Sequence, residues 1–114
     1  MKKLLTLCVL ILALSASLFA QAPEGINYQA IARDLTGSEL ANTPVAVQVH
    51  IMNSSLTTIY QEDHNATTNA FGLFNIVIGQ GQNPTSNFSN INWAASPYYL
   101  RIYVDANGSG LVDM

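Results

Sequence analysis

The chain has 114 residues, with four basic and seven acidic side chains and a single cysteine. Both lysines, Lys2 and Lys3, lie at the start, so residues 21–114 hold two arginines against seven acids, a net charge of 2 − 7 = −5. Such a surface cannot neutralise several phosphates, which argues against binding to nucleic acid or to anionic lipid. The cysteine, Cys8, also lies near the start, so residues 21–114 cannot form a disulfide.

The first 20 residues have the three parts of a secretory signal. Lys2 and Lys3 precede an apolar stretch over residues 4–19, and small residues follow it. This pattern predicts cleavage between Ala20 and Gln21. The apolar stretch, about 16 residues, is shorter than the roughly 20 that cross a bilayer as a helix. We therefore expect an exported protein with no membrane span after cleavage.

Beyond the signal, apolar residues recur with a period of two, which predicts strands and no helix. The strands are expected at residues 26–33, 45–52, 58–68, 73–78 and 98–105. We expect 58–68 to be an edge, 73–78 to be buried on both faces, and 82–96 to fold over the core as a lid. Short strands separated by turns predict an all-β fold, a small antiparallel β-sandwich after the helical signal peptide. The predicted core is Val47, Val49, Phe74, Ile76, Leu100 and Ile102.

Four segments, at residues 21–30, 67–74, 78–81 and 91–93, resemble the N-terminal domain of secreted and surface proteins of Bacteroidota-type bacteria. The resemblance implies a domain that follows the signal and precedes others at the cell surface, on the outer membrane face or outside the cell. Its partners would be downstream domains or other surface proteins. The middle also resembles transthyretin-like or carboxypeptidase-regulatory sandwiches, in which a glycine two residues before an aromatic, here Gly72 and Phe74, opens an inner strand.

One segment has the spacing of a calcium loop. Oxygen ligands at Asp105, Asn107, Ser109 and Asp113 match the first part of such a loop. The bidentate acid at position 12 and the flanking helices are missing. Asn-Gly and Ser-Gly pairs instead predict a hairpin turn here, with no metal.

Other chemistry-bearing residues are expected to be ordinary surface groups. A hairpin turning near residue 55 places Tyr60 opposite His50 and leaves His64 roughly 13 Å from His50, too far to share a zinc ion. Glu62 and Asp63 point to opposite faces of an edge strand, where we expect both to be exposed. Residues 21–114 hold no nucleophile elbow, thiol, lysine or zinc-protease motif, so we expect no catalysis and no cofactor.

The leading functional hypothesis is a non-catalytic structural or interaction module. The alternative is a carbohydrate- or peptide-binding module in which Trp93, Tyr99 and Tyr103 form an aromatic face for a glycan. A third hypothesis is an accessory domain of a secreted hydrolase. The sequence stops after a turn, at residues 111–114, so we expect the domain to lack a closing strand and to expose an edge prone to association.

Overall fold

The computed structural model describes residues 2–16, 24–95, 97–108 and 110–114. The N-terminal segment is a helix, α1 (Lys2–Ala16). The predicted cleavage site at Ala20 and Gln21 lies outside the described residues. Within those residues, no helix has the length and apolar character needed to cross a membrane.

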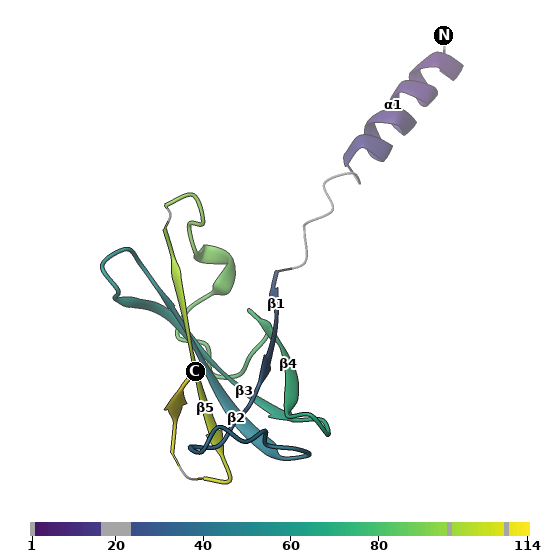
Figure 1. Ribbon diagram of the computed structural model, residues 1–114. Coiled ribbons are helices and arrows are strands. Elements are labelled where there is room, and N and C mark those ends of the chain that lie inside the picture. The colour runs from purple at the N-terminus through teal and green to yellow at the C-terminus, as the bar shows by residue number, and fades with distance from the viewer. Residues whose placement is uncertain (1, 17–23, 96, 109) are drawn as a thin grey trace.

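The remainder is built from strands, as predicted, in two antiparallel sheets (Figure 1). The smaller sheet pairs β1 (Ile26–Ile31) with β4 (Leu73–Ile78). The larger has the order β3-β2-β5-β6, formed by β2 (Pro44–Met52), β3 (Thr58–Thr67), β5 (Tyr99–Ala106) and β6 (Val112–Asp113). A single 3₁₀ turn, η1 (Phe88–Asn90), interrupts the long loop between β4 and β5. β3 is an edge strand of its sheet, as the sequence predicts.

The core lies between the two sheets. Alternate residues of β2 face it, and β1 and β4 contribute the opposite side through pairs such as Tyr28 with Ile76 and Ala30 with Phe74. The prediction that residues 73–78 are buried on both faces is wrong. Asn75 is exposed, because the outward face of the two-stranded sheet is open to solvent.

The pairing of β2 with β3 differs from the prediction by one residue. Met52 pairs with Thr58 beside the turn, but a β-bulge follows, and Ile51 then pairs with Tyr60 and His50 with Gln61. Tyr60 is therefore not opposite His50. Because side chains alternate between faces, a one-residue shift exchanges the faces of the whole strand. The bulge turns Tyr60, Glu62 and His64 towards the core.

One predicted core residue, Leu100, is 45% exposed, whereas the other five are buried. β6 is short and pairs only with Tyr103 and Val104, and the N–H of Met114 adds one hydrogen bond to the Ile102 carbonyl. Among the described residues, no strand pairs with Leu100 on that side of β5.

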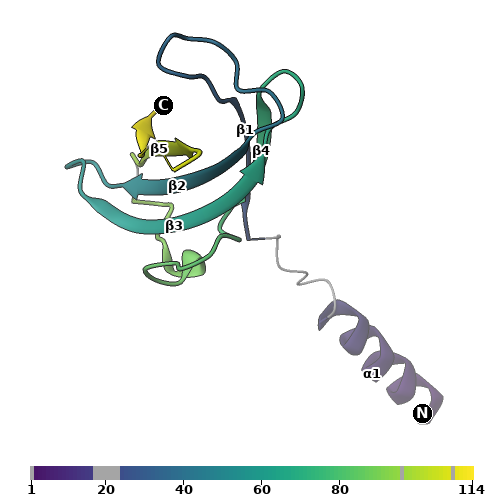
Figure 2. The same cartoon turned by 90° about the horizontal axis from the view of Figure 1, so that it is seen from below.

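The strands follow one another around the domain as an incomplete ring (Figure 2). β1 pairs with β4, β4 contacts β3, and the order then runs through β2 and β5 to β6. Among the described residues, β1 and β6 each have one strand neighbour. The ring is therefore open between these two strands.

Candidate binding groove

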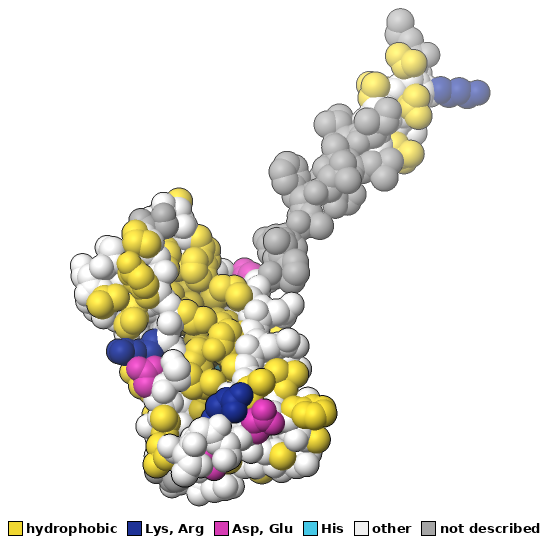
Figure 3. All heavy atoms as spheres, in the orientation of Figure 1, with side chains coloured by type: hydrophobic (Ala, Val, Ile, Leu, Met, Phe, Trp, Pro, Cys, Tyr) yellow, Lys and Arg dark blue, Asp and Glu magenta, His cyan; other side chains and the backbone are white. Residues whose placement is uncertain are grey.

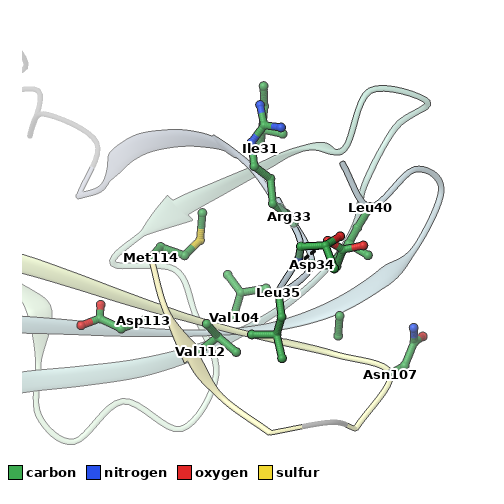
Figure 4. A pocket seen from close by; sticks show the side chains of 13 residues that line it. Ile31, Arg33, Asp34, Leu35, Leu40, Val104, Asn107, Val112, Asp113 and Met114 are labelled. Carbon is green, nitrogen blue, oxygen red and sulfur yellow. Dashed lines mark hydrogen bonds between the residues drawn. The ribbon is translucent and has the colours of Figure 1, made fainter. Parts of the chain in front are cut away.

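A groove of about 690 Å³ occupies the opening between β1 and β6. Its walls come from the end of β1, the loop that follows it, and β5 with β6. The main apolar side chains that line it are Ala32, Leu35, Leu40, Val104, Val112 and Met114. Figure 3 shows apolar side chains gathered in the hollow between the β5 and β1 sides of the molecule. In Figure 4, Leu35, Val104 and Val112 point into the same space from three different elements.

Leu35 projects from a tightly hydrogen-bonded turn at the rim of the groove. The Asp34 carboxylate accepts hydrogen bonds from the hydroxyl of Thr36, at 2.6 Å, and from the backbone N–H groups of Thr36 and Ser38, each at 2.9 Å. These bonds, led by that from the Thr36 hydroxyl, hold the pKa of Asp34 below its usual value. The turn therefore fixes the backbone on both sides of Leu35, whose side chain is 91% exposed.

Ion pairs lie on both sides of the groove. Arg33 contacts Glu39 at 3.8 Å and donates a hydrogen bond to the Gly37 carbonyl, and on the opposite wall Asp113 contacts Arg101 at 3.0 Å. Both pairs are half exposed, so they contribute little to stability. They leave the floor of the groove to apolar side chains.

A second polar feature is buried in the core. Glu62 is fully buried, and its carboxylate accepts hydrogen bonds from the N–H groups of Gly79, at 2.6 Å, and Gly81, at 2.7 Å, and from the Tyr60 hydroxyl, at 3.1 Å. His64 Nε2 lies 3.1 Å from the same carboxylate. The expectation that Glu62 is an exposed edge charge is wrong, because the bulge in β3 turns it inward.

This cluster fastens the loop after β4 onto β3. A Cβ atom placed on Gly81 would lie 2.7 Å from the Glu62 carboxylate, the His64 ring and the Asp63 carbonyl. Further along the loop, Phe88 is buried against Tyr60, with ring centroids 5.6 Å apart. The loop thus covers one end of the core, as the sequence predicts.

The three aromatic residues predicted to share a face are separated. Trp93 packs between Phe88 and Tyr98, at centroid distances of 5.5 and 5.4 Å, on the loop side of the core. Tyr99 and Tyr103 instead pair with Met52 and Gln48 on the outer face of the larger sheet. The structure therefore does not bring Trp93 together with them.

The outer face carries a small polar network around Tyr103. The rings of Tyr103 and His50 have their centroids 5.0 Å apart, and the Arg101 guanidinium lies 6.0 Å from the Tyr103 centroid. Burial, followed by the positive charge of Arg101, lowers the pKa of His50. His64 pairs with Val47, so it lies 50 − 47 = 3 residues along β2 from His50 and on the other face. The two histidines are apart, as expected, although the register differs.

The segment with calcium-loop spacing is a hairpin turn between β5 and β6, as predicted. Asn107 and Gly108 have positive φ angles of 58° and 70°, and Tyr103 pairs with Asp113 across the hairpin. Asp105 accepts a hydrogen bond from the Gly110 N–H, and Asp113 is paired with Arg101. Ser109 lies outside the described residues, and among the described residues no three acidic, histidine or cysteine side chains gather into a metal site.

Sequence reasoning missed both Glu62 and the groove. Leu35 precedes a predicted turn, so the sequence gives no reason to distinguish it from other loop residues. The bulge that buries Glu62 could not be predicted either, because β3 contains no glycine that would indicate it. The one available signal was Gly79-Gln80-Gly81, whose two glycines expose the backbone N–H groups that Glu62 binds.

Comparison with known proteins places this architecture in a family. No curated protein and no solved structure shows significant similarity to the chain. The family model described as a domain of unknown function, DUF8740, matches residues 27–114, which include every strand except the first residue of β1. The chain therefore belongs to the DUF8740 family.

Proposed function

We propose that this protein is a non-catalytic interaction module whose groove binds an apolar segment of another polypeptide. The observation that carries the proposal is the display of Leu35, 91% exposed, on a hydrogen-bonded turn beside an apolar groove. Val112 and Met114, on the opposite wall, are also about half exposed. Contiguous exposed apolar surface of this kind marks interaction sites in soluble proteins.

The energetics favour binding at this place. Full burial of a leucine, valine or methionine side chain contributes about 1.5–3 kcal/mol. A ligand that covers all three gains nearly the full contribution from Leu35, and about half of it from Val112 and from Met114, which are already half buried. The turn is already held by the Asp34 hydrogen bonds, so little conformational entropy of the loop is lost on binding.

The polar groups of the groove support binding over catalysis. Arg33 and Asp113 are each engaged in an ion pair, and Asp34 is occupied by the turn that it caps. General acid–base chemistry needs a positioned side chain that is free to transfer a proton to or from the substrate. These three side chains are instead engaged with neighbouring groups in the walls of the groove.

We propose in addition that the module works outside the cytoplasm. Supporting this are Lys2 and Lys3, which precede the apolar residues of helix α1 as the basic residues of a secretory signal do. Mass spectrometry of the protein that accumulates outside the cytoplasm should give the mass of a chain whose first residue is Gln21. Recovery of the intact chain beginning at Met1 would contradict export with cleavage.

Binding can be tested with a short synthetic peptide in which valine alternates with threonine and lysine closes each end. We expect fluorescence anisotropy to show saturable binding to the purified protein, weakened at least tenfold by Leu35→Asp combined with Val112→Asp. Leu56→Asp is the matched control, because Leu56 is also an exposed leucine, 63% accessible, but lies in the β2–β3 turn away from the groove. No binding, or equal loss in the control, would refute the proposed function.

A further inference from the structure

We propose that Asn107 is a site of spontaneous covalent modification, at which the backbone nitrogen of Gly108 displaces the side-chain nitrogen of Asn107 as ammonia. The products are aspartate and isoaspartate in the turn between β5 and β6. The inference concerns the covalent chemistry of the chain itself, so it goes beyond the proposed function. Water is the one co-reactant that the chemistry uses.

The reaction has two balanced steps. In the first, the Gly108 nitrogen forms a bond to the side-chain carbonyl carbon of Asn107, and the bond from that carbon to the amide nitrogen breaks. Ammonia leaves with the proton that the Gly108 nitrogen gives up, and a five-membered succinimide ring remains. In the second step, water opens the ring. Opening at the side-chain carbonyl gives aspartate, whereas opening at the main-chain carbonyl gives isoaspartate, in which the main chain runs through Cβ.

The surroundings of Asn107 favour this attack. Asn107 is the one asparagine in the sequence that a glycine follows, and both residues are exposed. A side chain on the following residue would hinder the approach of the two reacting atoms. Glycine has none, nothing lies within 4 Å of a Cβ placed on Gly108, and glycine accepts both signs of φ, so the peptide group can rotate. Figure 4 shows Asn107 at the tip of the turn, away from the other labelled side chains. In the described part of the chain, no hydrogen bond holds the Asn107 amide or the Gly108 N–H.

Asparagines in two other turns are held in place. The side-chain oxygen of Asn53 accepts hydrogen bonds from the N–H groups of Ser55 and Thr57, each at 3.0 Å. Asn69 makes the same two bonds, to the N–H groups two and four residues after it. A side chain held in this way is not free to meet the nitrogen of the next residue. The structure therefore separates Asn107 from these two asparagines.

Isoaspartate changes the geometry of the turn between β5 and β6. Its main chain is longer by one methylene, and in a hairpin the turn sets the register of the two strands. Here the register pairs Tyr103 with Asp113 and Val104 with Val112. The ion pair of Asp113 with Arg101 is half exposed and adds little. We therefore expect the isoaspartyl form to release β6 from β5, whereas aspartate adds a charge and leaves the backbone unchanged.

The first experiment follows the purified protein in mildly alkaline buffer, which favours removal of the Gly108 amide proton. Mass spectrometry of proteolytic peptides locates each gain of about one dalton, and fragmentation distinguishes isoaspartate from aspartate. We expect modification of Asn107 at least tenfold faster than that of Asn53. Gly108→Asp should slow the reaction at least tenfold, because aspartate tolerates the positive φ of 70° but carries a side chain.

Three results of this experiment would overturn the proposal. They are an unmodified Asn107, modification of Asn53 that keeps pace with that of Asn107, and an unchanged rate in Gly108→Asp.

The second experiment measures the release of β6 by hydrogen exchange. It compares the isoaspartyl form, separated by chromatography, with the variant Asn107→Asp, which carries the same charge without the extra methylene. In the unmodified protein the Met114 N–H donates to the Ile102 carbonyl at 2.9 Å. We expect this amide to exchange at least tenfold faster in the isoaspartyl form than in Asn107→Asp. Equal exchange in the two forms would overturn the release of β6.

The groove should respond to the same modification, because Val112 lines it. We expect the isoaspartyl form to bind the valine–threonine peptide at least threefold more weakly than Asn107→Asp does, and this expectation alone rests on the proposed function. Equal binding by the two forms would overturn the effect on the groove. Absence of peptide binding by the unmodified protein would refute the proposed function and leave the modification of Asn107 standing.

Discussion

The carboxylate of Glu62 accepts a hydrogen bond of 2.7 Å from the backbone N–H of Gly81, which lies 19 residues further along the chain. A second bond, from Gly79 at 2.6 Å, reaches the other carboxylate oxygen. A buried charge is costly unless hydrogen bonds satisfy it, and here the loop backbone supplies them. The two glycines and the acid therefore depend on one another.

We predict that Glu62→Gln destabilises the protein by about 1–3 kcal/mol, the range for leaving a buried hydrogen-bond donor without an acceptor. The amide would place a donor where the carboxylate now accepts from a backbone N–H. Asp63→Asn is the matched control, because Asp63 is adjacent but its side chain makes only long contacts, of 3.4 Å, to Gln48 and Asn83. Urea unfolding should show a large shift in midpoint for the first variant and a small one for the second. Similar shifts in both would contradict the assigned role of Glu62.

The buried acid also shows where sequence reasoning succeeds and where it fails. Alternating apolar residues such as Val45, Val47 and Val49 predicted β2 because a period of two defines a strand with one buried face. In β3 the same reasoning assumed an uninterrupted hairpin register. The bulge beside Ile51 and Met52 inserts one residue, and every later side chain of β3 changes face.

The groove could not be predicted for a different reason. It depends on which strands end the ring, and strand order is a long-range property that no local pattern encodes. The sequence suggested an open edge at residues 98–105, but β6 pairs with part of β5, and among the described residues β1 and β6 are the strands beside the groove that have one neighbour. Leu35 acquires its significance only from this arrangement.

We predict that Gly81→Ala weakens the attachment of the loop. The added Cβ would lie 2.7 Å from three atoms, two of them in the Glu62 carboxylate and the His64 ring. Overpacking of this kind costs about 1–3 kcal/mol. Thermal unfolding should show a clear loss of stability, whereas Gly108→Asn should be nearly neutral, because nothing lies within 4 Å of a Cβ there and asparagine tolerates its positive φ of 70°. Equal effects would exclude steric contact at Gly81 as the cause.

We predict an alkaline transition from Tyr60. Burial, reinforced by the negative charge of Glu62 and their hydrogen bond, raises the pKa of Tyr60 from 10.0 to about 12. Between pH 10 and 12 the unfolded chain loses this proton while the folded chain keeps it, so stability falls with rising pH. The loss from this group amounts to roughly 2–3 kcal/mol.

The measurement is chemical unfolding at pH values from 9 to 12, with ultraviolet titration of the phenolic groups alongside. Tyr60→Phe should lessen the dependence of stability on pH in this window. It should also remove the phenolic titration near pH 12. If wild type and variant lose stability in parallel, the transition does not come from Tyr60.

We predict that His50 titrates below its ordinary pKa of 6.5, because burial and the nearby Arg101 both disfavour its charged form. Arg101→Gln should raise the pKa of His50, and Asp63→Asn should lower it further, since Asp63 opposes the shift. Because the unfolded chain binds this proton first, the contribution of His50 to stability is lost as pH falls below 6.5. Nuclear magnetic resonance titration of the imidazole protons checks each direction, and an unchanged pKa in both variants would contradict the coupling.

The final prediction concerns the core and uses two phenylalanines close together in the chain. Phe74 is 1% exposed on β4 and pairs with Ala30, whereas Phe71 is 69% exposed in the preceding turn. Phe74→Ala removes buried surface and leaves a cavity, which costs about 3–5 kcal/mol, out of roughly 5–15 kcal/mol for a typical domain. Phe71→Ala removes the same atoms at a solvent-exposed position, so it should change the free energy of unfolding by less than about 0.5 kcal/mol. Unfolding by urea, followed by the fluorescence of Trp93, measures both. If Phe74→Ala leaves the midpoint unchanged, then the inward face of β4 is not the one that carries Phe74, Ile76 and Ile78.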